Sequence, residues 1–200
     1  APLGASGTLD GLKGCAMGQG IDDAIMQRVE SLSGFAQARI ACRQAAGGLD
    51  FEFPEARVIL DGSGKPCGVD LRVKNQATSL VEEAMILANE VVAVHLHERD
   101  FPALYRVHEK PSPDSLAALL PVLSEFSWFN RISPERFVAG DAHAVQQVLS
   151  ESQGRLEADL VQALVLRAMK RACYKPECEG HYGLASAAYA HFTSPIRRYP

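Results

Sequence analysis

The sequence predicts an α+β domain in which helices and strands are mixed and helices outnumber strands. Apolar residues recur at helical spacing in several long stretches, whereas residues 56–73 alternate apolar and polar positions on both sides of a glycine turn. The predicted strands do not alternate regularly with helices, which argues against a doubly wound sheet. With 200 residues, 47% hydrophobic and 22% charged, the chain has the composition of a globular domain with a proper core.

The first half of the chain contains two predicted helices with a hairpin between them. A long amphipathic helix is expected over residues 21–40, and Gly47-Gly48 supplies a stop. The hairpin over 56–73 follows. Thr78 or Ser79 is expected to cap the next helix, with Glu82 and Glu83 in its first turns, where carboxylates favour the positive end of the helix dipole.

The second half is predicted to be mostly helical. A strand over 103–107 precedes a helix that begins after Ser112, with proline at its first position, and runs to about residue 126. Asp141 is expected to cap a helix that ends near residue 152, before the break at Gly154. A last helix is expected over 155–173. Residues 1–20 hold six glycines and are expected to form a loop-like lead-in to the domain over 21–200.

Cysteine content points to a cytoplasmic protein. The chain has five cysteines, an odd number for a disulfide framework, and its net charge of −4 shows no whole-chain basic excess that would indicate nucleic acid binding. No run of about 18 apolar residues suggests a membrane span, and the first residues lack the pattern of a secretory signal. Because there is no initiator methionine and the last residues look structured, we expect a fragment of a longer chain.

The last thirty or so residues are locally basic. They end in Thr193-Ser194-Pro195-Ile196-Arg197-Arg198, a predicted helix start. Arg197 and Arg198 oppose the helix dipole there unless an anion joins them. Backbone N–H groups and guanidinium donors would then converge on a phosphate, although the same residues also suit an exposed basic turn.

Three other groups have both a chemical and a structural interpretation. Cys173, Cys178, His181 and His191 are soft metal ligands, but their spacing differs from that of common zinc knuckles, so buried or idle thiols are the alternative. Adjacent glutamates on a helix diverge by about 100°, so at most one of Glu82 and Glu83 points into a site. A phenylalanine such as Phe51, in a short run before a proline, is commonly a core residue.

Four segments of the chain form a recognisable pattern when taken in order. They are Ser79-Leu-Val-Glu-Glu-Ala-Met-Ile-Leu-Ala-Asn89, Leu104-Tyr-Arg-Val-His108, Gly180-His-Tyr-Gly-Leu-Ala-Ser186 and Tyr189-Ala-His-Phe-Thr-Ser-Pro-Ile-Arg-Arg-Tyr199. Together they resemble the RNB catalytic domain of the ribonuclease II and ribonuclease R family. The resemblance runs from about Ile21 to the last residue, and the last two segments are closer in sequence to ribonuclease R.

The resemblance implies a processive 3′ to 5′ exoribonuclease that hydrolyses single-stranded RNA to nucleoside 5′-monophosphates by Mg²⁺-assisted attack of water. In this family pattern Arg197 would contact the scissile phosphate, and Arg198 would belong to the RNA-binding surface. Glu82 would accept a hydrogen bond from a ribose 2′-OH. Phe51, by a looser alignment, would stack on a terminal base.

The chain departs from the family pattern in its acidic residues. The aspartate cluster that holds Mg²⁺ in the family has no counterpart here, so the metal ligands are expected upstream and the RNB domain is expected to be incomplete at both ends. We therefore expect this chain to be inactive alone. Two alternatives stay open: a non-catalytic RNA-binding relic, and a small zinc-binding module built on the Cys173, Cys178, His181 and His191 group.

Overall fold

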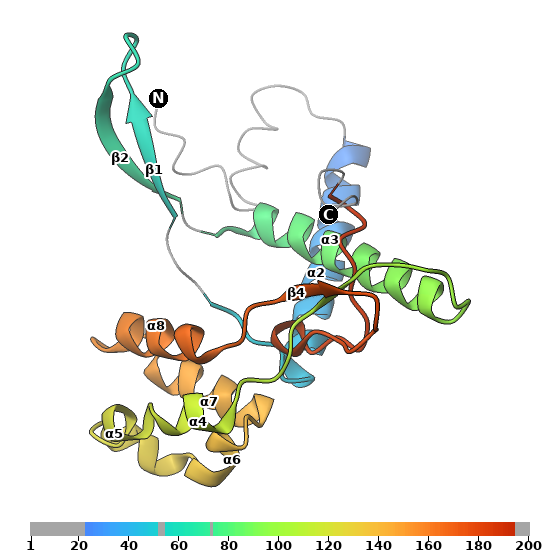
Figure 1. Cartoon of the computed structure of the whole chain (residues 1–200). Helices are drawn as coiled ribbons and strands as arrows, with labels where there is room; N and C mark the ends of the chain where they lie inside the picture. The colour runs from blue at the N-terminus through green and yellow to red at the C-terminus, as the bar shows by residue number, and fades with distance from the viewer. Residues whose placement is uncertain (1–22, 52–54, 73, 195–200) are drawn as a thin grey trace. The chain divides into compact units, whose positions relative to one another are not determined.

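A computed structural model describes residues 23–51, 55–72 and 74–194 and confirms the mixed α+β class (Figure 1). Two antiparallel two-stranded sheets, β1–β2 and β3–β4, lie among helices. In chain order the elements are α2 (Asp23–Ala45), β1 (Glu55–Leu60), β2 (Pro66–Arg72), α3 (Gln76–His97), β3 (Tyr105–Val107), α4 (Pro113–Ala117), α5 (Leu120–Leu123), η1 (Ser127–Arg131), α6 (Pro134–Val138), α7 (Ala142–Ser152), α8 (Ala158–Ala168), β4 (Cys173–Lys175) and η2 (Tyr182–Leu184).

The chain divides into two compact units. One contains Ala1–Ile40 and Glu52–Ala84, and the other contains Ala41–Phe51 and Met85–Pro200. Helices α2 and α3 each continue from one unit into the other, because the boundaries fall inside them. The cavities described below are lined by residues of the second unit.

In the first unit the predicted hairpin is confirmed. Val58 pairs with Val69 in an antiparallel register, and Asp61 closes the turn by accepting hydrogen bonds from the backbone N–H groups of Ser63 and Lys65 at 2.8 and 2.9 Å. The apolar side chains of the hairpin are exposed on both faces of the ribbon. They are Val58, Ile59, Leu60, Val69 and Leu71.

The long first helix is also confirmed, as α2. Its predicted apolar face is only partly covered, because Ile25 and Leu32 are exposed whereas Ala36 is buried.

The start of α3 corrects the predicted cap. Asn75, and not Thr78 or Ser79, caps the helix, because its side-chain Oδ1 accepts a hydrogen bond from the Thr78 N–H at 3.0 Å. Thr78 returns a bond by accepting from the Asn75 N–H at 2.9 Å. The two residues form a reciprocal capping box, so Thr78 lies one turn inside the helix.

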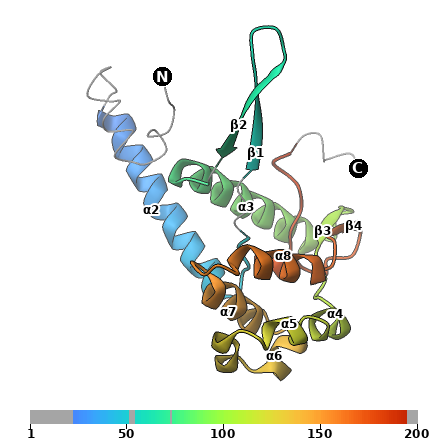
Figure 2. The same cartoon turned by 90° about the vertical axis from the view of Figure 1, so that its left-hand side faces the viewer.

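The second unit has its main core among α4 to α8. Figures 1 and 2 both show α4, α5, α6 and α7 gathered on one side of α8. The predicted helix after Ser112 is wrong in length, because it ends at Ala117 and a separate α5 follows. Pro121 lacks an N–H group, so a continuous helix would lose a hydrogen bond there. The fully buried members of this core include Leu116, Leu123, Phe137, Val145, Val148, Val161 and Val165.

Short side chains cap α4, α6 and α7, whereas α5 and α8 start without a side-chain cap. Ser112 and Asp141 accept hydrogen bonds from the N–H groups of Ser115 and Ala144, which confirms both predicted caps. Ser133 caps α6 in the same way, a helix that the sequence analysis did not predict.

The last predicted helix is wrong at its C-terminal end. Helix α8 ends at Ala168, and Cys173 begins strand β4, which pairs with β3. Val107 lies opposite Cys173 in that ladder, so pairing with a distant strand overrides the helical spacing. A second core cluster covers this sheet and consists of Ala93, Tyr105, Val107, Ala188 and Ala190.

Candidate functional site

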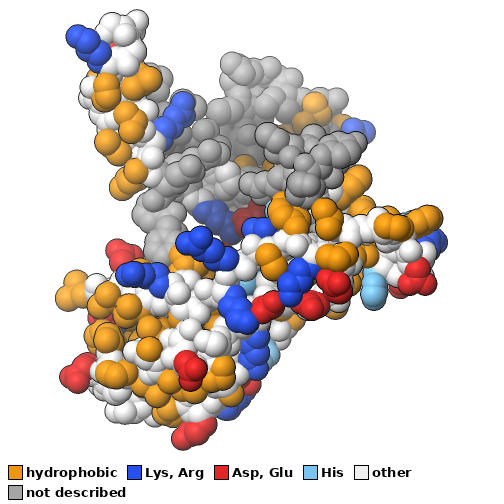
Figure 3. Space-filling view, in the orientation of Figure 1, with side chains coloured by type: hydrophobic (Ala, Val, Ile, Leu, Met, Phe, Trp, Pro, Cys, Tyr) orange, Lys and Arg blue, Asp and Glu red, His pale blue; other side chains and the backbone are white. Residues whose placement is uncertain are grey.

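A basic cavity in the second unit is the candidate site. Its volume is about 800 Å³. On the face shown in Figure 3, Lys and Arg side chains gather around the connection between α8 and β4. The lining includes four basic residues, two histidines and one phenylalanine. They are Arg106, Arg167, Lys170, Arg171, His108, His181 and Phe51.

The position of Phe51 is compatible with both a core role and a base-stacking role. Its ring packs against the main core cluster, yet it is partly exposed and lines the cavity. Leu49, two residues earlier, donates its backbone N–H to the Gly183 carbonyl at 2.9 Å. This bond ties the Phe51 segment to the Gly180–Ser186 motif, although the two are far apart in sequence.

Strand β3 and the residue that follows it supply two cavity residues, Arg106 and His108, that were not predicted as site residues. Tyr105 and Val107 are buried, so Arg106 and His108 alternate onto the opposite face of the strand. The guanidinium of Arg106 lies 4.8 Å from the centre of the Tyr174 ring, a cation–π contact that fixes its position. The alternation of buried and cavity-facing positions within the Leu104–His108 motif was the sequence signal that could have identified these two residues.

Two histidines meet at the cavity wall, where burial disfavours their charged forms. The rings of His108 and His181 lie 4.9 Å apart, edge to face. Burial lowers the pKa of His181 to about 4, and the charges of His108 and Arg106 act in the same direction. Burial also lowers the pKa of His108. The charge of the cavity therefore comes from its arginines and lysine.

Lys170 belongs to an ion-pair chain at the cavity rim. Its Nζ lies 2.5 Å from Glu109, which also binds Lys175 at 2.7 Å, and Lys175 binds Glu179 at 2.7 Å. Hydrogen bonds from Lys170 and Lys175 lower the pKa of Glu109 to about 2. With Lys170 held by a carboxylate, Arg167 and Arg171 are exposed cations that line the cavity outside this ion-pair chain.

The two glutamates of α3 differ in their surroundings. Glu82 has a side chain that is 42% exposed and forms an ion pair of 2.8 Å with Lys74. Glu83 is buried, with 1% exposure. The structure therefore agrees with the expectation that adjacent helical glutamates point in different directions.

The predicted arginines fall beyond the described chain. Arg197 and Arg198 lie outside the described residues, which end at Ser194. The structure does place Thr193, the first residue of their motif, in contact with α3 through Asn89.

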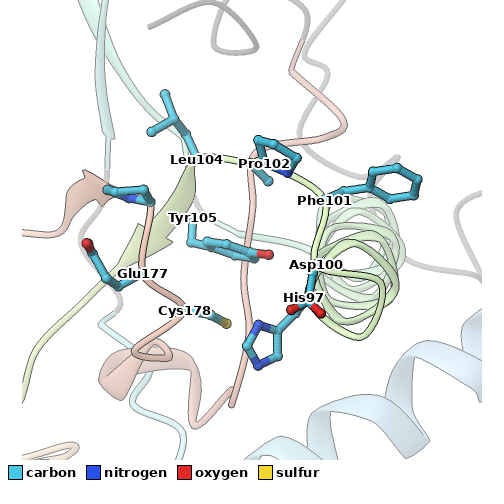
Figure 4. A pocket seen from close by; sticks show the side chains of 10 residues that line it. His97, Asp100, Phe101, Pro102, Leu104, Tyr105, Glu177 and Cys178 are labelled. Atoms are coloured by element: carbon cyan, nitrogen blue, oxygen red, sulfur yellow. The ribbon is translucent and has the colours of Figure 1, made fainter.

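A second cavity, of about 630 Å³, lies beside β3 and is shown in Figure 4. Tyr105 and Cys178 point into it, and His97 faces it from the end of α3. Its carboxylates are Asp100 and Glu177, so it differs from the basic cavity in charge.

This arrangement bears on the zinc alternative. Cys178 lines the second cavity, whereas His181 lines the basic one. His191 is hydrogen-bonded through Nδ1 to the Tyr174 hydroxyl at 2.6 Å, and burial raises the pKa of the Cys178 thiol, which disfavours a thiolate ligand. Within residues 23–51, 55–72 and 74–194, no group of three or more His, Cys, Asp or Glu side chains is arranged to hold a metal ion. The zinc module therefore has no support in this structure.

Among the described helices, none is both long and apolar enough to cross a membrane.

Comparison with known proteins gives one family. Residues 12–200 match the RNB domain. The chain is 42% identical over 162 residues to ribonuclease R of Aquifex aeolicus, which covers 79% of this chain and 22% of that protein. It is 35% identical over 180 residues to ribonuclease R of Escherichia coli, which covers 88% of this chain and 21% of that protein. The chain thus spans about a fifth of the length of these relatives.

A solved structure agrees with the sequence comparison. Mycoplasma genitalium RNase R, in complex with ribose methylated single-stranded RNA, superposes with a TM-score of 0.77 at 26% identity. The match covers 89% of this chain and 27% of that one. Together with the RNB match over residues 12–200, this similarity shows that the chain belongs to the RNB-domain family, whose curated members similar to it are ribonucleases R.

Proposed function

We propose that this chain is the middle and later part of the catalytic domain of a cytoplasmic 3′ to 5′ exoribonuclease, with residues 1–20 as a lead-in and 21–200 within the domain. The longer protein of this proposal is called the parent enzyme below. It would hydrolyse single-stranded RNA to nucleoside 5′-monophosphates in the presence of Mg²⁺. The observation that carries the proposal is the basic cavity, in which arginines and one aromatic ring line the same space in a member of the RNB-domain family.

The cavity residues suit an RNA strand. Guanidinium groups bind phosphate oxygens through paired hydrogen bonds, and Arg106, Arg167 and Arg171 line the cavity. An aromatic ring stacks on bases without regard to their sequence, and Phe51 offers such a ring at the cavity wall. The M. genitalium relative was solved with single-stranded RNA, which supports the choice of ligand.

The roles of Arg197, Arg198 and Glu82 belong to the same proposal. Arg197 would contact the scissile phosphate and stabilise its developing charge, and Arg198 would bind the RNA strand beside it. Glu82 would accept a hydrogen bond from a ribose 2′-OH. Its carboxylate is partly exposed, and the 2′-OH would replace part of its ion pair with Lys74.

The residues described here do not fit a magnesium site, because none of their carboxylates assembles into a group of three possible ligands. No step of the reaction is therefore assigned to a metal held by this chain. We propose that the Mg²⁺ ligands lie upstream in the parent enzyme and that the isolated chain is inactive.

The direction and products of cleavage test this function. The parent enzyme is given a single-stranded RNA labelled at its 5′ end, and the same RNA closed into a circle serves as the control without a 3′ end. We expect progressive shortening from the 3′ end and release of nucleoside 5′-monophosphates, with the circle intact. Cleavage of the circle, or internal fragments from the linear RNA, would contradict an exonuclease.

A further inference from the structure

We propose that Asn89 is a positioning residue: by holding Tyr189 and Thr193, it sets where the chain leads into the sequence motif that contains Arg197. Its contacts belong to the second unit and come from the described residues. The catalytic consequence rests on the function proposed above, whereas the structural part can be tested without activity.

Asn89 holds two groups about one hundred positions away in sequence. Its side chain is on α3, with 4% exposure for the residue. The amide Nδ2 donates to the Tyr189 hydroxyl at 3.0 Å, and Oδ1 accepts from the Thr193 backbone N–H at 2.9 Å. One planar amide thus uses its donor and its acceptor on the same distant segment, and this pair of bonds fixes the segment's register on the helix.

Tyr189 connects this bridge to the cavity. Tyr189 is 9% exposed, and its carbonyl accepts a hydrogen bond from the Arg106 N–H at 2.8 Å. Its ring lies 5.3 Å from the His181 ring, edge to face. Arg106 and His181 both line the basic cavity, so Tyr189 is fixed to the cavity wall at its backbone and to Asn89 at its hydroxyl.

His191 secures the same segment from the other side. Its Nδ1 is hydrogen-bonded to the Tyr174 hydroxyl at 2.6 Å, and Tyr174 also lies under the Arg106 guanidinium. The chain from Tyr189 to Thr193 is therefore held between α3 and the β3–β4 sheet. Thr193, which donates its backbone N–H to Asn89, lies four residues before Arg197 in the sequence.

From this arrangement we expect loss of the Asn89 amide to lower the rate of RNA cleavage more than the affinity for RNA. Loss of the amide removes the acceptor of the Thr193 N–H and one hydrogen bond of the Tyr189 hydroxyl, so the residues around Thr193 shift to recover hydrogen bonds. A small displacement of a group that acts on the reacting phosphate lowers the chemical rate strongly. RNA held by the cavity arginines and by Phe51 is little affected.

The first arm of the test is kinetic and uses the parent enzyme. Asn89→Leu keeps the side-chain size and removes both hydrogen bonds, and we expect it to lower kcat by about 10- to 100-fold while the Kd for RNA changes by less than about twofold. In an Arg197→Ala background the same substitution is expected to add less than about a twofold loss, because the group it positions is already absent. An equal loss in both backgrounds would overturn the proposal.

The second arm is hydrogen–deuterium exchange, which needs no activity. Asn89→Leu is expected to speed exchange of the Thr193 amide by about tenfold or more, because its acceptor is gone. Tyr189→Phe removes only the hydroxyl and is expected to give a smaller increase at the same amide. Val148→Ala, in the fully buried main core, is the control for general destabilisation and is expected to leave the Thr193 amide protected under native conditions.

The two proposals fail in different ways. A parent enzyme that does not degrade RNA would refute the proposed function, while the exchange experiment still decides whether Asn89 holds Thr193. An active parent enzyme with unchanged Thr193 exchange in Asn89→Leu would refute the positioning role alone.

Discussion

The Nδ1 atom of His108 accepts a hydrogen bond from the backbone N–H of Gly183 at 3.1 Å, and this bond joins strand β3 to the Gly180–Ser186 motif. The approach is close, since a Cβ added to Gly183 would lie 2.9 Å from the same Nδ1 atom. The His181 N–H group bonds the Ser186 carbonyl nearby at 2.8 Å, so the motif folds back on itself beside this contact. Glycine at position 183 is thus required by the space that His108 occupies.

Gly183→Ala is expected to lower the free energy of unfolding by about 1–3 kcal/mol, because the new methyl group displaces His108 and weakens its hydrogen bond. Urea unfolding measures the change. Gly34→Ala is the matched control, because a Cβ at that position in α2 meets nothing within 4 Å. Alanine in a helix interior is expected to stabilise by about 0.5–1 kcal/mol. A stabilising effect at both positions would contradict the crowding at His108.

His181 is expected to make the fold sensitive to acid. Its folded pKa of about 4 lies below the ordinary histidine value of 6.5, so the unfolded chain binds more protons between these values and stability falls as the pH drops from about 6.5 to 4. Burial is the main cause of this low pKa, and electrostatic interactions with His108, Arg106 and His191 act in the same direction.

The matched variant for this effect is His181→Asn. Asparagine keeps an acceptor for the Leu184 N–H group that the His181 side chain now caps, but it does not titrate. Thermal unfolding at pH 7 and pH 4.5 is the measurement. The variant is expected to lose less Tm on acidification than the wild type, and an equal loss would show that other groups cause the acid sensitivity.

Arg167 and Arg171 are expected to contribute phosphate contacts. Arg167→Ala and Arg171→Ala should each weaken RNA binding at low salt and reduce the slope of log K against log salt by about 1. Fluorescence anisotropy at several salt concentrations measures both quantities. Arg131→Ala removes the same charge from a residue whose side chain is 69% exposed and pairs with Glu151 away from the cavity lining. A control slope that changes as much as the others would mean that only net charge matters.

Glu82 is expected to help distinguish RNA from DNA. Glu82→Gln should reduce the preference of the parent enzyme for RNA over DNA of the same sequence by about tenfold, because the charged carboxylate acceptor for the 2′-OH is replaced by a weaker, neutral amide oxygen. Glu98→Gln, just after the end of α3, is the control at an exposed position. If the preference changes only in Glu83→Gln, the role belongs to the buried glutamate and the assignment to Glu82 is wrong.

Local signals predicted much of the fold. The caps at Ser112 and Asp141 and the turn of the hairpin over residues 56–73 depend on neighbours in sequence, and all three were confirmed. The predicted end of the last helix at residue 173 failed because Cys173 pairs with Val107, a contact between distant strands. Helical spacing alone does not report such pairing.

The candidate site shows the same division between local and distant contacts. Phe51 and the basic character of the C-terminal segment were predicted, and the structure adds Arg106 and His108 through the alternation of β3. The Asn89 bridge joins residues about one hundred positions apart, so no local pattern could reveal it. The positions of Arg197 and Arg198 stay predictions.

The most direct test compares the isolated 200-residue chain with the parent enzyme on single-stranded RNA with a free 3′ end, with and without Mg²⁺. The account predicts that the chain alone binds RNA weakly and releases no nucleotides, whereas the parent enzyme releases nucleoside 5′-monophosphates only when Mg²⁺ is present. RNA binding without cleavage by the parent enzyme would instead support a non-catalytic RNA-binding relic. Magnesium-dependent release of nucleotides by the isolated chain would contradict the account, because its own residues would then supply the metal site.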